Sequence, residues 1–355
     1  MSTIQSSLSA TPSTDEIFHH LKVKLGTTVP EMVLFEKAII AEEIHRLKRE
    51  RNAVILAHNY MASTLYHAVP DFTGDSLELS RYATTVEADI IVLCGVEFMA
   101  ETAKILNPEK TVLLPSRAGC SLASSITAKD VRMLKERYPG VPVVTYINTY
   151  ADVKAETDIC CTSGNAVKVV ESLDTDTIIF LPDEYLASNI AKETGKHIIV
   201  PTAMTASQLD TTSVQNTFIG WNGRCEVHDQ FSVEDIENVR KDYPDVVVLA
   251  HPECKPEVVA ASDMSGSTAA MIKYVQSTTA KRILLLTECS MGENIASSNP
   301  ATDVLRLCSV RCPHMAEISL ENVLWSLKEM KHIVEIPEDI RVRAYQSVKR
   351  MLDIG

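Results

Sequence analysis

Glycine is scarce in this chain, which has only 12 glycines among its 355 residues. Neither Gly-x-Gly-x-x-Gly nor Gly-x-x-x-x-Gly-Lys-Ser/Thr occurs in the sequence. These two motifs bring backbone N–H groups close to the phosphates of dinucleotides and of nucleoside triphosphates. Their absence argues against a conventional dinucleotide-binding domain and against a P-loop.

Long apolar runs and an excess of basic residues are missing as well. No apolar run approaches the roughly 20 residues that cross a bilayer, and no apolar segment typical of a secretory signal accompanies the first basic residue, Lys22. Lys and Arg number 34 against 47 Asp and Glu, which gives a net charge of −13. This charge repels polyphosphates and anionic lipid headgroups. We therefore expect a cytoplasmic protein that has neither nucleic acid nor a membrane as partner.

Short apolar runs rich in β-branched residues alternate with amphipathic segments along the chain. The runs are about five to eight residues long, which is typical of buried strands. They lie at 53–60, 89–95, 111–115, 141–148, 177–183, 197–201, 246–253 and 282–288. This alternation predicts an α/β fold with parallel sheets.

Landmarks in these runs recur at fixed spacing. The polar strand ends at His58, Tyr146 and His251 are separated by 88 and 105 positions. The small turns that follow, at 74–76, 162–164 and 266–268, keep the same spacing within one residue. Any α/β protein shows some recurrence of strands, but here the polar residues recur too. We infer three homologous repeats, with an insertion at 201–217 that we expect to be a surface loop.

The repeats predict the domain organisation. We expect α/β repeat domains at 36–126, 127–230 and 231–316, preceded by a partly disordered, Ser/Thr-rich N-terminal extension, 1–35. A C-terminal segment, 317–355, should pack back on the core. Ligands of open parallel sheets bind beyond the carboxyl ends of the strands. Three such ends would then face one shared site.

Three of the nine cysteines follow the repeat. Cys120, Cys225 and Cys312 are separated by 105 and 87 positions and stand in polar loop sequences. One thiolate from each domain would make one three-cysteine site per chain, which leaves the fourth corner of an iron–sulfur cubane as an open iron that can act as a Lewis acid. The alternative is that these are ordinary buried cysteines. The fold is then three homologous parallel-sheet α/β sandwich domains in a pseudo-threefold arrangement around a central cluster.

The other cysteines leave alternatives open. Cys308, with Cys312 and His314, could hold zinc or form a redox-sensitive disulfide. Cys254 is undecided, since it lies beside a polar strand end. A rival function is an iron–sulfur electron carrier or redox sensor without a substrate, in which Cys308 or Cys254 supplies a fourth ligand. We expect buried free thiols at the cysteines in or beside apolar runs, which are Cys94, Cys160, Cys161 and Cys289.

From about Phe35 to the C-terminus the sequence resembles the quinolinate synthases, iron–sulfur enzymes of de novo NAD biosynthesis. The motifs that carry the resemblance are Ala57-His58-Asn59-Tyr60, Gly74-Asp75-Ser76-Leu77, 95–101, Tyr146-x-Asn148, 161–167, Cys225-x-x-His228, His251-Pro252-Glu253 and Gly266-Ser267-Thr268. The resemblance implies condensation of iminoaspartate with dihydroxyacetone phosphate to give quinolinate, phosphate and water. It also implies a [4Fe-4S] cluster on Cys120, Cys225 and Cys312, and the enzyme that supplies iminoaspartate becomes a candidate partner.

The same resemblance places the substrate at the strand ends and small turns. We expect Glu253 to be the catalytic base, with Tyr146 and His58 as further catalytic residues. Three of the small-turn pairs also stand where helices begin, where they can cap the helix and bind an anion. The expected substrate-binding residues are His58, Tyr60, Asp75, Ser76, Tyr146, Ile147, Asn148, Ser163, His228, His251, Pro252, Glu253, Ser267 and Thr268.

Overall fold

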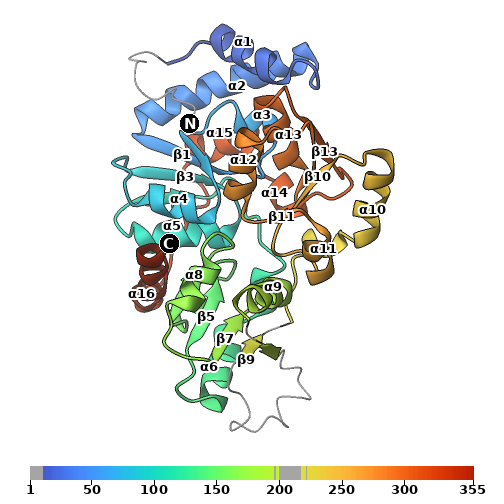
Figure 1. Ribbon diagram of the computed structural model, residues 1–355. Helices are drawn as coiled ribbons and strands as arrows, with labels where there is room; N and C mark the ends of the chain where they lie inside the picture. The colour runs from blue at the N-terminus through green and yellow to red at the C-terminus, as the bar shows by residue number, and fades with distance from the viewer. Residues whose placement is uncertain (1–10, 196, 200–216, 221) are drawn as a thin grey trace. The chain divides into compact units, whose positions relative to one another are not determined.

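The computed structural model describes residues 11–195, 197–199, 217–220 and 222–355 (Figure 1). The chain forms two compact units that are built from discontinuous segments. Unit 1 comprises Met1–Ala118, Ser290–Pro300 and Pro313–Glu335, and unit 2 comprises Gly119–Cys289, Ala301–Cys312 and Ile336–Gly355.

Unit 1 contains one parallel sheet with the strand order β2-β1-β3-β4. Its strands are β1 (Ala53–His58), β2 (Phe72–Gly74), β3 (Ile90–Cys94) and β4 (Thr111–Leu113). Its helices are α1 (Thr14–Leu25), α2 (Glu31–Glu50), α3 (Ser63–Tyr66), α4 (Ser76–Ala83), α5 (Glu97–Leu106), α13 (Cys289–Ser298, from its second residue on), α14 (Pro313–Ala316) and α15 (Leu320–Glu329). Because α2, α4, α5 and α15 pack against the sheet, β1 and β3 are buried almost throughout, which requires their continuous apolar sequences.

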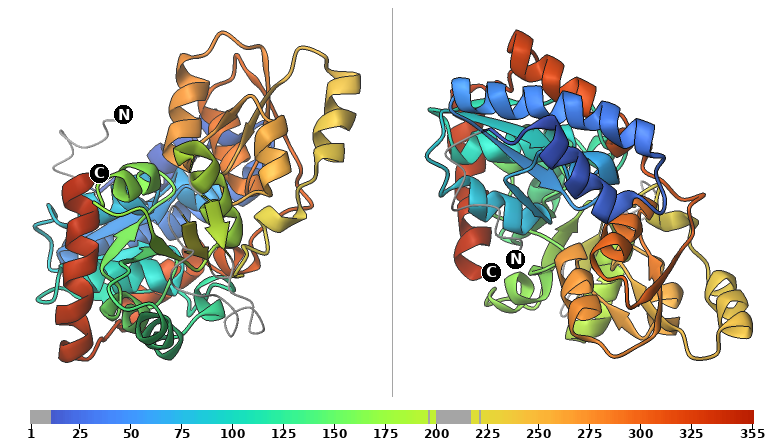
Figure 2. Two further views of the ribbon diagram at one scale, coloured as in Figure 1. Left: turned by 60° about the horizontal axis from the view of Figure 1, so that its bottom comes forward. Right: turned by 90° about the horizontal axis from the view of Figure 1, so that it is seen from above.

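Unit 2 contains two parallel sheets, with the strand orders β6-β5-β7-β9-β8 and β11-β10-β12-β13. The first sheet is formed by β5 (Val143–Tyr146), β6 (Ile159–Cys161), β7 (Ile178–Leu181), β8 (His197–Ile199) and β9 (Thr217–Gly220), and the second by β10 (Val247–Ala250), β11 (Met264–Ser265), β12 (Arg282–Leu286) and β13 (Asp303–Arg306). The helices are α6 (Ala128–Arg137), α7 (Ala151–Ala155), α8 (Ala166–Glu171), α9 (Glu184–Thr194), α10 (Val233–Asp242), α11 (Pro256–Ala261), α12 (Thr268–Ser277) and α16 (Glu338–Ile354). The C-terminal helix α16 lies against α7 and β6 (Figure 2).

The three sheets share one topology. In each, the first strand in sequence is flanked by the second and the third. The fourth strand lies beyond the third in the two four-stranded sheets, whereas in the five-stranded sheet the fifth strand, β9, takes this place and the fourth, β8, lies at the edge beside it. Capping boxes begin α6, α10 and α15 at Thr127, Ser232 and Ser319, with the same spacing of 105 and 87 positions that separates the three cysteines. The predicted α/β class with parallel sheets is confirmed. The pseudo-threefold arrangement and the domain boundaries stay predictions.

The predicted N-terminal extension contains helix α1, whose N-cap Ser13 forms a capping box with Glu16. The disorder expected at the start of the chain falls on residues 1–10, and the loop expected at 201–217 falls almost wholly on residues 200–216. Both segments lie outside the described residues. Among the helices that the structure describes, none is long and apolar enough to cross a membrane.

Candidate active site

Polar side chains lie at the carboxyl ends of two strands of unit 2. Tyr146 is the last residue of β5, and His251 directly follows β10. Both are buried, and Glu253, two residues beyond His251, is only 3% exposed. The N–H of Ile147 donates to the carbonyl of Cys161 at 2.8 Å, which extends the β5–β6 pairing past Tyr146. The local chain path therefore directs these polar side chains into a buried strand-end site.

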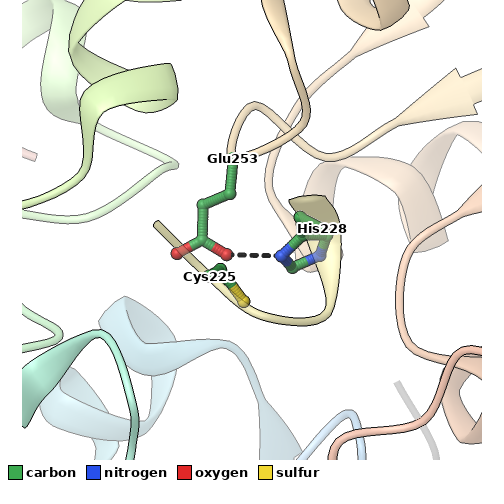
Figure 3. A group of neighbouring side chains, drawn as sticks. All are labelled: Cys225, His228 and Glu253. Atoms are coloured by element: carbon green, nitrogen blue, oxygen red, sulfur yellow. Dashed lines mark ion pairs between the residues drawn. The ribbon is translucent and has the colours of Figure 1, made fainter. Parts of the chain in front are cut away.

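Glu253 is the centre of this site. Its Oε2 lies 2.7 Å from Nδ1 of His228 and 3.3 Å from Nδ1 of His251, and Asn148 donates from Nδ2 to Oε1 at 3.3 Å. Figure 3 shows the carboxylate facing the His228 ring, with the Cys225 sulfur beside them. The two imidazoles stack with their centroids 4.5 Å apart, and Nε2 of His228 lies 3.1 Å from Oγ1 of Thr287. Three predicted site residues, His228, His251 and Asn148, thus meet at the carboxylate of a fourth, Glu253.

The protonation of this cluster follows from burial and from its partners. Burial opposes the charged form of Glu253, but the two neighbouring imidazoles outweigh burial and lower the pKa of this carboxyl below its ordinary value. Burial and the adjacent His251 lower the pKa of His228. We take Glu253 as ionised, because the two imidazoles that face Oε2 favour the charged carboxylate. An ionised carboxylate at this position can accept a proton from a bound molecule.

Cys225 brings a thiol to the same place. Its Sγ, a ring nitrogen of His228 and a carboxylate oxygen of Glu253 all lie within 4.8 Å of one another. The Cys225 loop is attached to the start of helix α9 by the backbone, because the N–H of Glu184 donates to the carbonyl of Gly223 at 2.8 Å and the N–H of Gly223 donates to the carbonyl of Pro182 at 3.0 Å. The loop and the strand-end cluster are therefore parts of one site.

Cys120 and Cys312 lie near Cys225 within unit 2. Burial, together with the nearby Glu253 and Cys312, raises the pKa of the Cys120 thiol to about 12. The pKa of the Cys225 thiol is raised well above its ordinary value by burial and then by Glu253 and Cys120. Cys225 and Cys312 also pack against the same buried cluster, which includes Val227, Phe231 and Val310.

The donor set fits an iron–sulfur cluster. Cys120 and Cys225 each precede a short 3-10 turn, at Ala123–Ser125 and His228–Gln230, and backbone N–H groups of these turns donate to the two sulfurs. Three converging thiols without a cation disfavour the thiolate form, whereas bound iron favours it. Backbone donors to the sulfurs are the partners that such clusters use.

One cysteine expectation is corrected by the structure. Cys289 is buried as expected, but it is not a free thiol, because it forms a disulfide with Cys308. The two residues follow the neighbouring parallel strands β12 and β13, so their Cα atoms come within 5.1 Å. Cys308 is exposed, and its pairing with Cys289 separates it from Cys120, Cys225 and Cys312, none of which takes part in a disulfide.

The small turns of the second and third repeats lie side by side. A Cβ added to Gly164 would come within 3.4 Å of the Ser267 hydroxyl, so the Ser163 turn contacts the N-terminus of α12. Ser267 caps that helix by accepting from the N–H of Ala270, and Thr268 is buried at its first turn. This contact brings predicted substrate-binding residues of two repeats together.

The predicted residues of the first repeat belong to unit 1. His58 ends β1, and its Nδ1 accepts from the N–H of Tyr60 at 3.2 Å. Asp75 caps α4 by accepting from the N–H groups of Leu77 and Glu78, as expected for a turn residue at a helix start. Ser76 is the first residue of that helix. These residues form a second strand-end cluster, within unit 1.

Two buried residues near Glu253 are absent from the sequence prediction. Asp183 is fully buried at the N-cap of α9, and burial together with the nearby Glu253 raises its pKa well above the ordinary value. Asn189, one and a half turns further along α9, donates to the backbone on both sides of Glu253. The repeat could have pointed to Asn189, because Asn294 occurs 105 positions later.

Three neighbouring thiols beside a buried carboxylate and two imidazoles, at the ends of parallel strands, define an α/β enzyme with a cysteine-rich candidate metal site. The chain belongs to the quinolinate synthase family, since residues 42–353 match the family described as "Quinolinate synthetase A protein".

Curated relatives agree with this assignment. The chain is 54% identical to "Quinolinate synthase 2" of Mesorhizobium japonicum, over 87% of this chain and 89% of that protein. It is 48% identical to "Quinolinate synthase" of Sinorhizobium medicae, over 98% and 91%. It is 53% identical to "Quinolinate synthase" of Xylella fastidiosa, over 88% and 86%. The predicted family and enzyme class are confirmed, and an electron carrier or sensor without substrate is not favoured.

Proposed function

We propose that this enzyme condenses iminoaspartate with dihydroxyacetone phosphate to form quinolinate, phosphate and water. The observation that carries the proposal is the cluster of Glu253, His228, His251 and Asn148 beside Cys225. Ring formation needs proton transfers and a dehydration, and these groups provide a proton acceptor next to a site for a Lewis acid.

The proposed cofactor is one [4Fe-4S] cluster held by Cys120, Cys225 and Cys312. When bound, its open iron would supply Lewis-acid chemistry toward a hydroxyl or carboxylate of the substrate. The protein's own groups do the rest. Glu253 is the proton acceptor, His228 and His251 hold its carboxylate in place, and Tyr146 and His58 are further proton-transfer candidates.

The substrates carry two carboxylates and a phosphate, although the protein has a net charge of −13. Backbone N–H groups at the N-terminus of α12 and in the Ser163 turn supply local donors for such anions. Ser267, Thr268, Ser163 and, in unit 1, Ser76 are therefore the proposed binding residues for the charged ends. The enzyme that supplies iminoaspartate is a proposed partner, because an imine of this kind hydrolyses in water.

The proposal is tested by anaerobic turnover. Purified protein with its metal retained should form quinolinate when both substrates are present, and none when either is left out. Formation of no quinolinate by protein with a full iron complement would contradict the proposed substrates.

A variant of Cys308 separates the disulfide from the cluster. We expect Cys308→Ser to keep the iron content and turnover of the wild type, because the structure pairs Cys308 with Cys289 and keeps Cys312 out of the disulfide. Iron analysis and anaerobic turnover check this expectation. Loss of iron in Cys308→Ser, with full iron in Cys312→Ser, would show that Cys308 is the third ligand.

A further inference from the structure

The amide of Asn189 holds the backbone on both sides of Glu253. Its Nδ2 donates to the carbonyl of Pro252 at 2.9 Å and to the carbonyl of Cys254 at 3.0 Å. An amide NH₂ has two protons, so one side chain can bind both carbonyls. Asn189 is 9% exposed and Cys254 is fully buried, so that water does not readily replace these bonds.

The same arrangement occurs independently in unit 1. Nδ2 of Asn294 donates to the carbonyls of Asn59 and Met61, at 3.2 Å and 2.9 Å. Asn294 follows Asn189 by 105 positions, which is the repeat spacing. The turn at 59–61 corresponds to the turn at 252–254, since the first follows His58 and the second follows His251. Each asparagine thus brackets the residue two positions after a strand-end histidine.

In the remaining repeat, a different side chain donates to the corresponding backbone carbonyl. Thr102 occupies the corresponding position on α5, but its hydroxyl donates within its own helix, to the carbonyl of Phe98 at 2.8 Å. The carbonyl of Thr149 corresponds to those of Met61 and Cys254, and it accepts from the ammonium of Lys154, which is fully buried. Each of the three strand-end turns therefore has a buried side-chain donor on this carbonyl. Buried backbone carbonyls are expected to have such a hydrogen-bond partner.

We propose that Asn189 and Asn294 are positioning residues for the reaction, each fixing the strand-end turn that carries a site residue. This inference rests on the proposed catalytic role of Glu253 and on the expected substrate-binding role of Tyr60. The distance of 2.7 Å between Glu253 and His228 depends on the path of the 251–254 turn. Without Asn189 the Pro252 and Cys254 carbonyls lose their shared donor, and the turn can shift the carboxylate away from the imidazole.

The first test replaces Asn189 by Leu, which has a similar volume and no donor. We expect kcat to fall by about tenfold to a hundredfold, the scale of a small misplacement of a reacting group, with KM within twofold and iron content unchanged. Thr102→Val is the matched control at the equivalent repeat position, and it should stay within twofold of wild-type kcat. Wild-type kcat in Asn189→Leu would overturn the proposal. If Asn189→Leu does not fold, Asn189→Ser, which keeps one donor, takes its place with the same expected pattern.

A double variant separates positioning from a purely structural role. If Asn189 acts through Glu253, Asn189→Leu combined with Glu253→Gln should turn over no more slowly than Glu253→Gln alone. Losses that multiply would show that Asn189 acts elsewhere and would overturn the proposal. Wild-type turnover in Glu253→Gln alone would instead contradict the proposed role of Glu253. Asn294→Leu tests the corresponding hydrogen bonds in unit 1, from Asn294 to the carbonyls of Asn59 and Met61. An unchanged kcat in this variant would overturn the inference for Asn294.

Discussion

Replacing Glu253 by Gln should lower quinolinate formation by at least about a hundredfold, the lower end of what a general acid–base group contributes. The amide keeps the shape of the side chain but cannot accept a proton as the carboxylate does. Asn148 and the two imidazoles can still hydrogen-bond to it, so the fold should be preserved. The measurement is anaerobic turnover at saturating concentrations of both substrates, with equal iron content in variant and wild type.

A matched control exists in the same unit. Glu184 forms an exposed ion pair with Arg224 beside the Cys225 loop, and exposed pairs contribute little free energy. Glu184→Gln should therefore keep turnover within about twofold of the wild type. If Glu253→Gln were equally active, the base would have to be sought among the other strand-end residues, Tyr146 and His58.

Replacing Cys120, Cys225 or Cys312 by Ser should remove the brown colour and abolish turnover together. Each thiol is one of three proposed ligands, and a serine hydroxyl is a poor substitute for a thiolate toward iron. Iron and sulfide content, visible absorbance and quinolinate formation check this expectation. The Cys308→Ser protein, changed four positions away from Cys312, is the control. A Cys225→Ser protein with full iron content and wild-type turnover would exclude Cys225 as a ligand.

The strands and their polar ends could be predicted because their signals are local. Apolar runs such as 53–58 and 282–286 are buried strands, and the repeat spacing located the residues that follow them. Unit 2 brings Asn148, His228, His251 and Glu253 together, because the carboxyl ends of β5 and β10, which belong to its two sheets, carry Asn148 and the His251–Glu253 turn to the same place. Whether His58 and Ser76 share that site stays a prediction.

Contacts that depend on packing between distant segments could not be predicted. The Cys289–Cys308 disulfide requires β12 and β13 to be neighbours with the observed register, which the spacing of the two cysteines does not reveal. The two hydrogen bonds of Asn189 join helix α9 of one repeat to the 252–254 turn of the next. Its repeat partner Asn294 was visible in the sequence, but an asparagine on a helix carries no signal of what its amide binds.

Metal and sulfide analysis of the anaerobically purified protein is the most direct test of the central claim, a three-cysteine cluster in a quinolinate synthase. The account predicts about four irons and four acid-labile sulfides per chain, with visible absorbance that disappears together with quinolinate formation when iron is removed. One zinc per chain, with no sulfide and no visible absorbance in active protein, would contradict it.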